Sequence, residues 1–384
     1  MPEGPGVSAA PARRQQEGRA VLVLSGGVAL GAFEAGVYAG LAEAGAGEPD
    51  WLLGSSAGAL NAAIIAGNAP EERVGALHRF WEGRAVEPMP GTSALLGPPR
   101  PEGAWRRAYS RAAVTQALLF GRPGLFRPRM AGGDLVGEVP SLYDLAPLRR
   151  RLPECLDFDR LNHPSAPRLS IAATDVVSGE RVVFDTRRDR IGPAQLLASC
   201  ALLPVFAPVE VEGRLLGDGG LSSNAPLDLL LDEEWEGQVL CVLVELFARR
   251  GGRPRTLAAS ASRAGDLSFG NQTRRLVEAC EREFRLRAVL AEVAERLPPE
   301  LREGPEIASL LREAGGPRRL TLLVLGQRAG LDEAGPGKVF DFSPLTLSER
   351  WSAGVAALHE GLRQIGERAG ETVASGLVLH EVEA

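Results

Sequence analysis

Histidine and lysine are scarce in this sequence. Its 384 residues include four histidines, and Lys338 is the only lysine, so nearly every basic residue is an arginine. The 43 basic residues are outnumbered by 49 acidic ones, for a net charge of -6. This balance offers no broad positive surface, and we expect no nucleic-acid partner. With so few histidines and no acidic loop of the EF-hand type, we also expect no metal and no organic cofactor.

Cysteine and long apolar runs are also sparse. Four widely spaced cysteines match neither a zinc ligand set nor a secreted disulfide framework. Residues 1–18 lack the apolar core of a signal peptide, and we expect a disordered tail there. Two uncharged stretches, residues 51–70 and 191–209, have the length of a membrane span, but Gly, Pro and polar residues interrupt them. We therefore expect a cytoplasmic protein, and peripheral contact with the inner face of a membrane is left open.

Apolar residues make up 45% of the chain, which is enough for a large core. Short apolar runs alternate with helical patterns. We predict strands at residues 20–24, 51–54, 168–174, 181–184, 239–246 and 320–325, a hairpin at 209–216, and helices at 32–44, 57–66, 194–201, 271–296 and 346–361. This alternation is typical of an α/β fold with a mostly parallel central sheet covered by helices on both faces.

A serine lies at a tight turn between the second predicted strand and its helix. Residues 54–58 read Gly-Ser-Ser-Ala-Gly and match the pattern G-x-S-x-G, in which small neighbours let the backbone turn sharply and expose the central hydroxyl. The hydroxyl of Ser56 would lie beside the first free N–H groups of the helix, which stabilise negative charge. Ser56 is therefore a candidate nucleophile.

A glycine-rich loop, residues 25–31, follows the first strand. Such a loop presents backbone N–H groups to an anion, either a phosphate or the oxyanion of an acyl-transfer intermediate. Its pattern G-G-x-x-x-G is neither the dinucleotide fingerprint G-x-G-x-x-G nor a P-loop, which also requires Gly-Lys-Ser/Thr. Nucleotide binding is therefore the weaker alternative.

Two later regions are less specific. Asp218 is set between glycines after an apolar strand, as either a plain turn or a catalytic carboxylate. Residues 80–140 are rich in Gly, Pro, Arg and large apolar side chains, and we expect either a wall or lid of an acyl-binding groove or a loop-rich cap over the core. The sequence alone leaves both pairs of alternatives open.

In combination, residues 25–31, the turn at 54–58 and residues 218–220 resemble the patatin-like phospholipase family. Residues 197–204 and 224–226 resemble further segments of it, so the resemblance spans residues 19–230. Residues 271–275 and 340–343 resemble the C-terminal extension of a bacterial branch. The resemblance implies a three-layer α/β fold with a catalytic domain at residues 19–230 and an extension at residues 231–384 that adds strands and helices to the same fold.

The resemblance also implies hydrolysis of acyl esters, lipids among them, by a serine-aspartate dyad. Ser56 would attack the ester carbonyl and form an acyl-enzyme, and Asp218 would act as the general base. Backbone N–H groups of Gly26, Gly27 and Val28 would form the oxyanion hole. The glycines that shape the three motifs would be Gly31, Gly54, Gly58, Gly219 and Gly220.

Two positions depart from the usual family loop, G-G-G-x-R-G. Val28 replaces a glycine, and Leu30 replaces the arginine. One alternative is therefore a catalytically silent scaffold or binding protein. Another is a conventional α/β-hydrolase with a Ser-Asp-His triad, which would take its histidine from His359 or His380. The head group, the acyl chain length and the oligomeric state cannot be predicted from the sequence.

Overall fold

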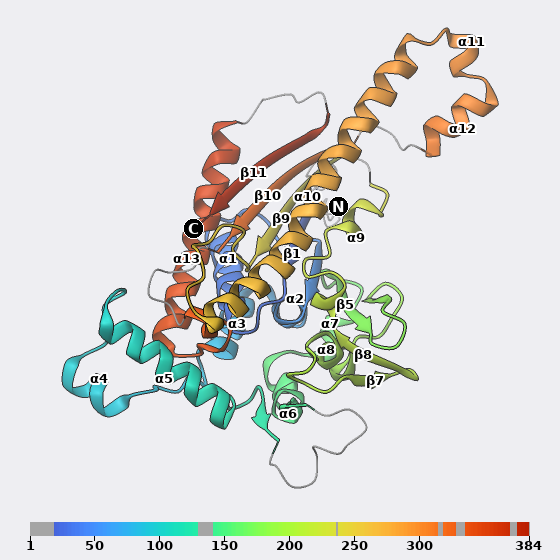
Figure 1. The fold of residues 1–384 in the computed structure, drawn as a ribbon. Helices are drawn as coiled ribbons and strands as arrows, with labels where there is room; N and C mark the ends of the chain where they lie inside the picture. The colour runs from blue at the N-terminus through green and yellow to red at the C-terminus, as the bar shows by residue number, and fades with distance from the viewer. Residues whose placement is uncertain are drawn as a thin grey trace, which may run out of the picture.

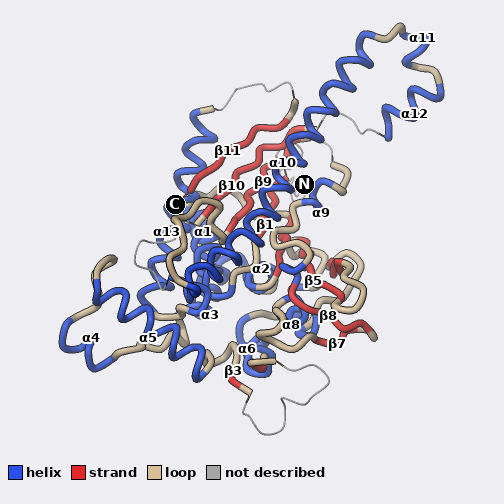
Figure 2. The backbone as a smooth tube through the Cα atoms, viewed as in Figure 1, coloured by secondary structure: helices blue, strands red, loops and turns tan. Residues whose placement is uncertain are grey.

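The computed structural model describes residues 19–129, 141–235, 237–313, 318–327, 335–368 and 375–383. The predicted tail at residues 1–18 lies outside the described residues. Within the described ranges, one nine-stranded sheet dominates the fold (Figures 1 and 2). Its strands are β1 (Arg19–Leu24), β2 (Trp51–Ser55), β5 (Arg168–Asp175), β6 (Arg181–Asp185), β7 (Val209–Val211), β8 (Arg214–Asp218), β9 (Gln238–Glu245), β10 (Arg319–Gly326) and β11 (Leu377–Glu383).

The sheet is mostly parallel. Its order is β11-β10-β9-β1-β2-β5-β8-β7, with β6 also pairing β5. Every pair from β11 to β5 is parallel, whereas β6, β7 and β8 form antiparallel pairs. The predicted hairpin is β7–β8, joined by Glu212 and Gly213, both at positive φ, as a two-residue hairpin turn requires. The predicted α/β class with a mostly parallel sheet is confirmed.

Helices cover both faces of the sheet because its central strands are apolar on both sides. On β1, Leu22 and Leu24 belong to one hydrophobic cluster, and Val21 and Val23 belong to the other. The first cluster contains α1 (Gly31–Glu43), α2 (Ala57–Ala66) and α13 (Pro344–Glu367), and the second contains α9 (Asp228–Leu231) and part of α10 (Leu257–Arg296). In Figure 1, α10 crosses the front of the sheet and extends beyond it toward α11 (Pro299–Arg302) and α12 (Pro305–Glu313).

Helix α13 packs tightly on α1 through two glycines. A Cβ at Gly36 would overlap the carbonyl of Trp351, and one at Gly354 would overlap the carbonyl of Phe33. Side chains at these positions would force the helices apart. The late helix thus supports α1, the helix that follows the glycine-rich loop.

Other helices connect these layers. They are α3 (Arg73–Trp81), α4 (Pro90–Leu96), α5 (Ala104–Phe120), α6 (Ala146–Cys155), α7 (Phe158–Leu161) and α8 (Pro193–Ser199), and short 3-10 turns are η1 (Val28–Leu30), η2 (Pro70–Glu72), η3 (Gly219–Leu221) and η4 (Gly335–Phe340). A separate small sheet pairs β3 (Arg127–Pro128) with β4 (Tyr143–Asp144). None of the helices in the described ranges is long and apolar enough to cross a lipid bilayer.

Three elements differ from the sequence prediction. Helix α5 lies in the segment at residues 80–140, where no helix was predicted. Several of its buried positions are polar or small, such as Arg106, Ser110 and Ala113, and so give no apolar stripe. Helix α10 begins at Leu257, well before residue 271. The prediction placed His380 in or beyond the last helix, and it does lie beyond α13, but on the strand β11, which was not predicted and which pairs with β10 along its whole length.

Candidate active site

Ser56 lies between β2 and α2 in a strained conformation. Its φ of 54° and ψ of -120° fall where side-chain-bearing residues are rare, and such strain is typical of functional turns. Gly54 and Gly58 make the turn possible: a Cβ at Gly54 would lie 2.7 Å from the backbone N of Ala59, and one at Gly58 would overlap the carbonyl of Leu24. The turn therefore requires both glycines of the motif.

The backbone of Ser56 is fixed by α8. Its N–H donates to the hydroxyl of Ser199 at 3.0 Å, and that hydroxyl donates to the carbonyl of Ala172 at 2.7 Å. The thiol of Cys200 approaches the carbonyl oxygen of Ser56 at 3.4 Å. Sequence reasoning assigned no role to Ser199, because its two partners lie on other strands and turns and only the fold brings them together.

Asp218 ends β8 and faces the serine. Both residues line the same cavity, and the carboxylate of Asp218 accepts the backbone N–H of Gly220 at 2.7 Å. The residue is 3% exposed. Burial raises the pKa of Asp218 to about 6, although the nearby Ser56 hydroxyl and the N–H of Gly220 act in the opposite direction. The structure thus brings together the two residues predicted as nucleophile and base, and the carboxylate has a basicity suited to neutral pH.

The glycine-rich loop lies against the serine. A Cβ at Gly26 would lie 3.0 Å from the Cβ of Ser56 and 2.7 Å from Oδ1 of Asn224. The N–H of Gly26 donates to the carbonyl of Asn224 at 3.1 Å, so the prediction that this amide faces an oxyanion is wrong. Gly26 instead has a spacing role, because its lack of a side chain lets the loop lie close to Ser56 and Asn224. In the described part of the chain, no hydrogen bond uses the N–H of Gly27 or Val28. These two amides remain the candidate oxyanion donors.

Val28 adopts a backbone conformation that glycine would accept more readily. Its φ is 53°, in the left-handed region where a β-branched side chain is strained. Val28 replaces the glycine of the resembled family loop, and its backbone keeps the positive φ that glycine adopts easily. The side chain of Val28 lines the cavity next to Ser56.

The C-terminal extension reaches the candidate site through Gln272 on α10. Its Oε1 accepts the N–H of Asn224 at 3.0 Å, and its Nε2 donates to the carbonyl of Gly220 at 3.3 Å. Asn224 in turn donates from Nδ2 to the carbonyl of Gly26 at 3.3 Å. One side chain of the extension therefore connects the loop of the base to the glycine-rich loop, a link that sequence reasoning did not identify.

An apolar cavity of about 50 Å³ opens beside the two candidate catalytic residues. Phe80, Trp81, Leu125 and Phe126 come from the segment at residues 80–140, part of which, 130–140, lies outside the described residues. These four side chains are also buried in the main core, so the segment both walls the cavity and caps the core. The full lining is Val28, Ser56, Ala57, Leu60, Phe80, Trp81, Leu125, Phe126, Leu145, Leu148, Cys200, Leu202, Phe206, Asp218 and Phe342.

The two histidines of the triad alternative lie elsewhere. His359 is on α13, half-exposed, with Nε2 at 3.9 Å from a carboxylate oxygen of Glu43, and His380 is buried on β11. Neither lines the cavity of Ser56. Over the described ranges, no group of three or more His, Cys, Asp or Glu side chains is arranged to hold a metal ion.

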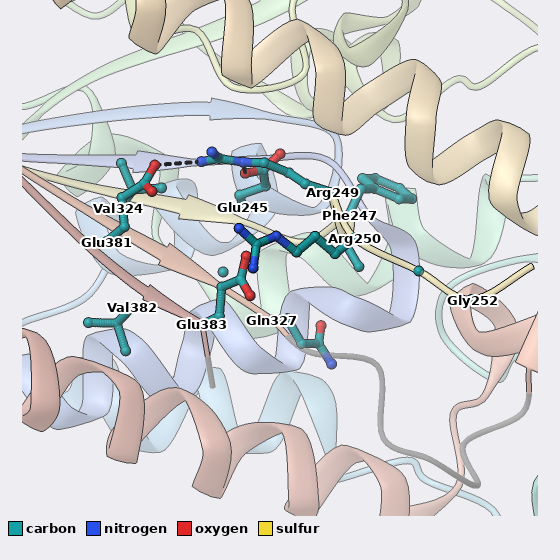
Figure 3. Close-up of a pocket in the computed structure, with 13 residues that line it drawn as sticks. Glu245, Phe247, Arg249, Arg250, Gly252, Val324, Gln327, Glu381, Val382 and Glu383 are labelled. Atoms are coloured by element: carbon teal, nitrogen blue, oxygen red, sulfur yellow. Dashed lines mark hydrogen bonds and ion pairs between the residues drawn. The ribbon is translucent and has the colours of Figure 1, made fainter.

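A larger and more polar cavity, about 500 Å³, lies at the ends of β9, β10 and β11 (Figure 3). Its buried carboxylate is Glu245, which accepts a hydrogen bond from Nε of Arg249 at 3.1 Å, and Nη2 of Arg249 lies 3.1 Å from Glu381. Burial raises the pKa of Glu245 to about 7. The residues that line this cavity include no serine, threonine, cysteine or histidine, so size alone does not identify the site of chemistry.

The comparisons with protein families agree with these motifs. A family described as patatin-like phospholipase matches residues 22–231, which include both candidate catalytic residues, and a family described as patatin phospholipase matches residues 267–371. Among solved structures, the crystal structure of VipD from Legionella pneumophila is similar at 15% identity and a TM-score of 0.36, with 91% of this chain and 67% of that chain covered. No curated protein matches the sequence.

Proposed function

The chain belongs to the patatin-like phospholipase family, and from that premise we propose that it is a serine hydrolase of acyl esters that uses a dyad of Ser56 and Asp218. The proximity of the Ser56 hydroxyl to the buried Asp218 carboxylate, in a cavity that both residues line, carries the proposal. The apolar lining of the cavity beside these two residues suits the hydrocarbon part of an acyl group, and its volume of about 50 Å³ accommodates the carbons next to the carbonyl.

The reaction proceeds in two halves. Oγ of Ser56 attacks the ester carbonyl carbon while Asp218 accepts the hydroxyl proton, and the tetrahedral intermediate then expels the alcohol, which takes up that proton. In the second half, Asp218 removes a proton from water, the resulting hydroxide attacks the acyl carbon, and the tetrahedral intermediate expels Oγ of Ser56, which takes the proton back from Asp218 as the acid is released. A base with a pKa of about 6 is ionised at neutral pH yet accepts a proton more readily than an ordinary aspartate.

The oxyanion formed in each half accepts hydrogen bonds from the N–H groups of Gly27 and Val28. Loss of one such donor typically raises the barrier by about 3 kcal/mol. Backbone donors do not depend on side-chain identity, so the replacement at Val28 is compatible with this role. The loop is held in position by Asn224 and Gln272, and this supports a functional unit formed by residues 19–230 together with the extension from residue 231.

The cellular setting remains part of the proposal. The four cysteines, Cys155, Cys200, Cys241 and Cys280, are free, which supports a cytoplasmic location. A lipid substrate would require contact with the inner face of a membrane or with dispersed lipid.

A fluorophosphonate probe and a short uncharged ester, p-nitrophenyl butyrate, test the proposal. Wild type should be labelled and active, Ser56→Ala should be neither, and the matched control Ser93→Ala, a serine of α4 that does not line the cavity, should behave as wild type. Labelled wild type whose activity is lost in the His359→Ala/His380→Ala double variant would favour a triad. Folded wild type that is neither labelled nor active would favour the silent scaffold, an alternative motivated by the strain at Val28.

A further inference from the structure

The last turn of α5 exposes large apolar side chains to solvent. Leu119 is 61% exposed and Phe120 is 74% exposed, and Leu142, just before β4, is 58% exposed. Leu118 is exposed as well. A group of exposed apolar side chains is typical of a surface that binds a partner or a membrane. We call these four residues, Leu118, Leu119, Phe120 and Leu142, the α5 apolar surface.

Tyr143 connects this surface to the Ser56 cavity. The centre of its ring lies 5.1 Å from that of Phe126, which lines the cavity. The Tyr143 hydroxyl donates to the carbonyl of Leu118 at 2.7 Å, so the end of α5 meets the chain at Leu142 and Tyr143. An apolar molecule on the α5 apolar surface would therefore lie close to Ser56.

Exposed arginines accompany the apolar side chains. Helix α5 contains three arginines and no acidic residue. Two of them, Arg107 and Arg111, are exposed. They precede Leu118 by eleven and seven residues, so all three side chains lie on one face of the helix. Arg149 and Arg150 on α6 are also exposed. The apolar surface is thus bordered by positive charge.

A second group of exposed apolar side chains lacks this positive charge. Leu286 and Leu290, near the end of α10, are 64% and 47% exposed. Figure 1 shows the end of α10 far from α5 and α6, on the opposite side of the molecule. Residues 281–313 contain eight acidic residues and six arginines, whereas residues 100–151 contain four acidic residues and ten arginines. Of the two groups, the one on α5 therefore suits an anionic partner.

We propose that the α5 apolar surface, together with the exposed arginines of α5 and α6, docks onto an anionic lipid bilayer. The apolar side chains enter the boundary between head groups and acyl chains, while the guanidinium groups bind lipid phosphates. A bilayer fits better than an acidic protein, because the neighbouring cavity is itself apolar and holds the candidate nucleophile. The proposal rests on the proposed function for its substrate, a lipid ester of that bilayer.

Vesicle binding by the full-length Ser56→Ala protein tests the proposal without turnover. One set of vesicles contains phosphatidylcholine and phosphatidylglycerol in equal amounts, and the other contains phosphatidylcholine alone. We expect tighter binding to the anionic vesicles, weakened by added salt. An added Arg107→Gln/Arg111→Gln change should weaken this binding roughly 10- to 30-fold. Leu119→Ser/Phe120→Ser should weaken it roughly 10- to 100-fold, since less apolar area enters the bilayer.

Two double variants at the end of α10 are the matched controls. Arg282→Gln/Arg296→Gln removes the same charge from exposed positions, and Leu286→Ser/Leu290→Ser removes exposed leucines. Neither should change the affinity for anionic vesicles. Losses in the controls equal to those in the α5 variants would overturn the proposal, because binding would then depend on overall charge and hydrophobicity alone.

Two further outcomes would also overturn it. One is the absence of binding to anionic vesicles. The other is unchanged binding in Leu119→Ser/Phe120→Ser, and a loss confined to the arginine variant would instead favour an acidic protein as the partner. If Leu119→Ser/Phe120→Ser fails to fold, Leu142→Ser must weaken binding, and unchanged affinity there counts equally against the proposal. Because these proteins lack the nucleophile, failure of vesicle binding and failure of the ester assay are distinguishable.

Discussion

Two buried carboxylates at the same edge of the sheet differ in what surrounds them. Asp218 lies beside β5 at the level where β2 turns into Ser56, and Glu245 lies at the end of β9, next to β1. Each is 3% exposed, and burial raises the pKa of each, to about 6 and about 7. Asp218 lies near the Ser56 hydroxyl and accepts the backbone N–H of Gly220, whereas Glu245 is paired with Arg249.

The comparison shows that a raised carboxyl pKa does not by itself identify a catalytic site. Burial alone raises the pKa of a carboxyl group, and it does so wherever a strand ends in an acidic residue under a loop. Catalysis also needs a nucleophile within reach and donors for the charge that develops. Only the Asp218 region of the two has a strained serine and a glycine-rich loop beside the carboxylate.

The sharpest test exchanges the two carboxylates for amides. Asp218→Asn should lower kcat/KM for p-nitrophenyl butyrate roughly 10²- to 10⁴-fold, because the serine loses its proton acceptor. Glu245→Gln should leave kcat/KM unchanged, since the residue contacts no reacting atom. Rates are compared well above pH 6, after circular dichroism shows that both variants are folded. Equal losses of kcat/KM in the two variants would show that Asp218 has no special role in the reaction.

Substitution of Gly26 should have the next largest effect on activity. Gly26→Ala introduces a methyl that meets Oδ1 of Asn224 at 2.7 Å and the Cβ of Ser56 at 3.0 Å. Displacement of the loop should lower kcat roughly 10- to 100-fold, comparable to partial loss of one oxyanion donor. Gly252→Ala, in the loop of the Glu245 cavity where a Cβ meets nothing, is the matched control. Full activity of Gly26→Ala would show that the loop does not act on the serine.

Activity should depend on pH through Asp218. The base must be ionised, so kcat/KM should fall about tenfold for each pH unit below its pKa of about 6 and level off above it. Glu245→Gln should show the same midpoint. A profile that stays flat well below pH 6, or a midpoint that moves in the Glu245 variant, would assign the titration to another group.

The link from α10 to the site should have a smaller effect. Gln272→Ala removes the hydrogen bonds to Asn224 and Gly220 and should lower kcat/KM by roughly 3- to 10-fold, in line with about 1 kcal/mol for a neutral hydrogen bond. Gln364→Ala, a glutamine of α13 bonded to Glu360, is the control. Identical activity of both variants would mean that the extension leaves the catalytic loops unaffected.

The sequence predicts the parts of this architecture that local patterns encode. Central strands such as β1 and β9 are continuous apolar runs, and the turn at Ser56 requires glycines at fixed spacing, so both can be recognised within a few residues. Helix α5 was not predicted, because its buried face contains polar and small residues such as Arg106 and Ser110 and shows no apolar stripe.

The contacts that hold the site in place cannot be predicted from local sequence patterns. Gln272 is 48 residues from Asn224, and Ser199 is 143 residues from Ser56. A single polar side chain shows no periodicity, so its partner becomes visible only when the strands and helices are placed together. The same reasoning applies to the Glu245 cavity, which three separate strands create.

The last expected effect concerns stability at Glu245 and leaves activity unchanged. Its pKa is raised from 4.5 to about 7 in the folded protein, so the folded state holds this proton more tightly than the unfolded state. The stabilisation that comes from this tighter proton binding is fully present below pH 4.5 and is lost as the pH rises through about 7. Glu245→Gln imitates the protonated form, and its free energy of unfolding relative to wild type should therefore increase from pH 4.5 to above pH 7 in urea titrations. A constant difference would show that Glu245 has the same pKa in the folded and unfolded protein, because Arg249 offsets the effect of burial. The two carboxylates would then differ in their basicity as well as in their neighbours.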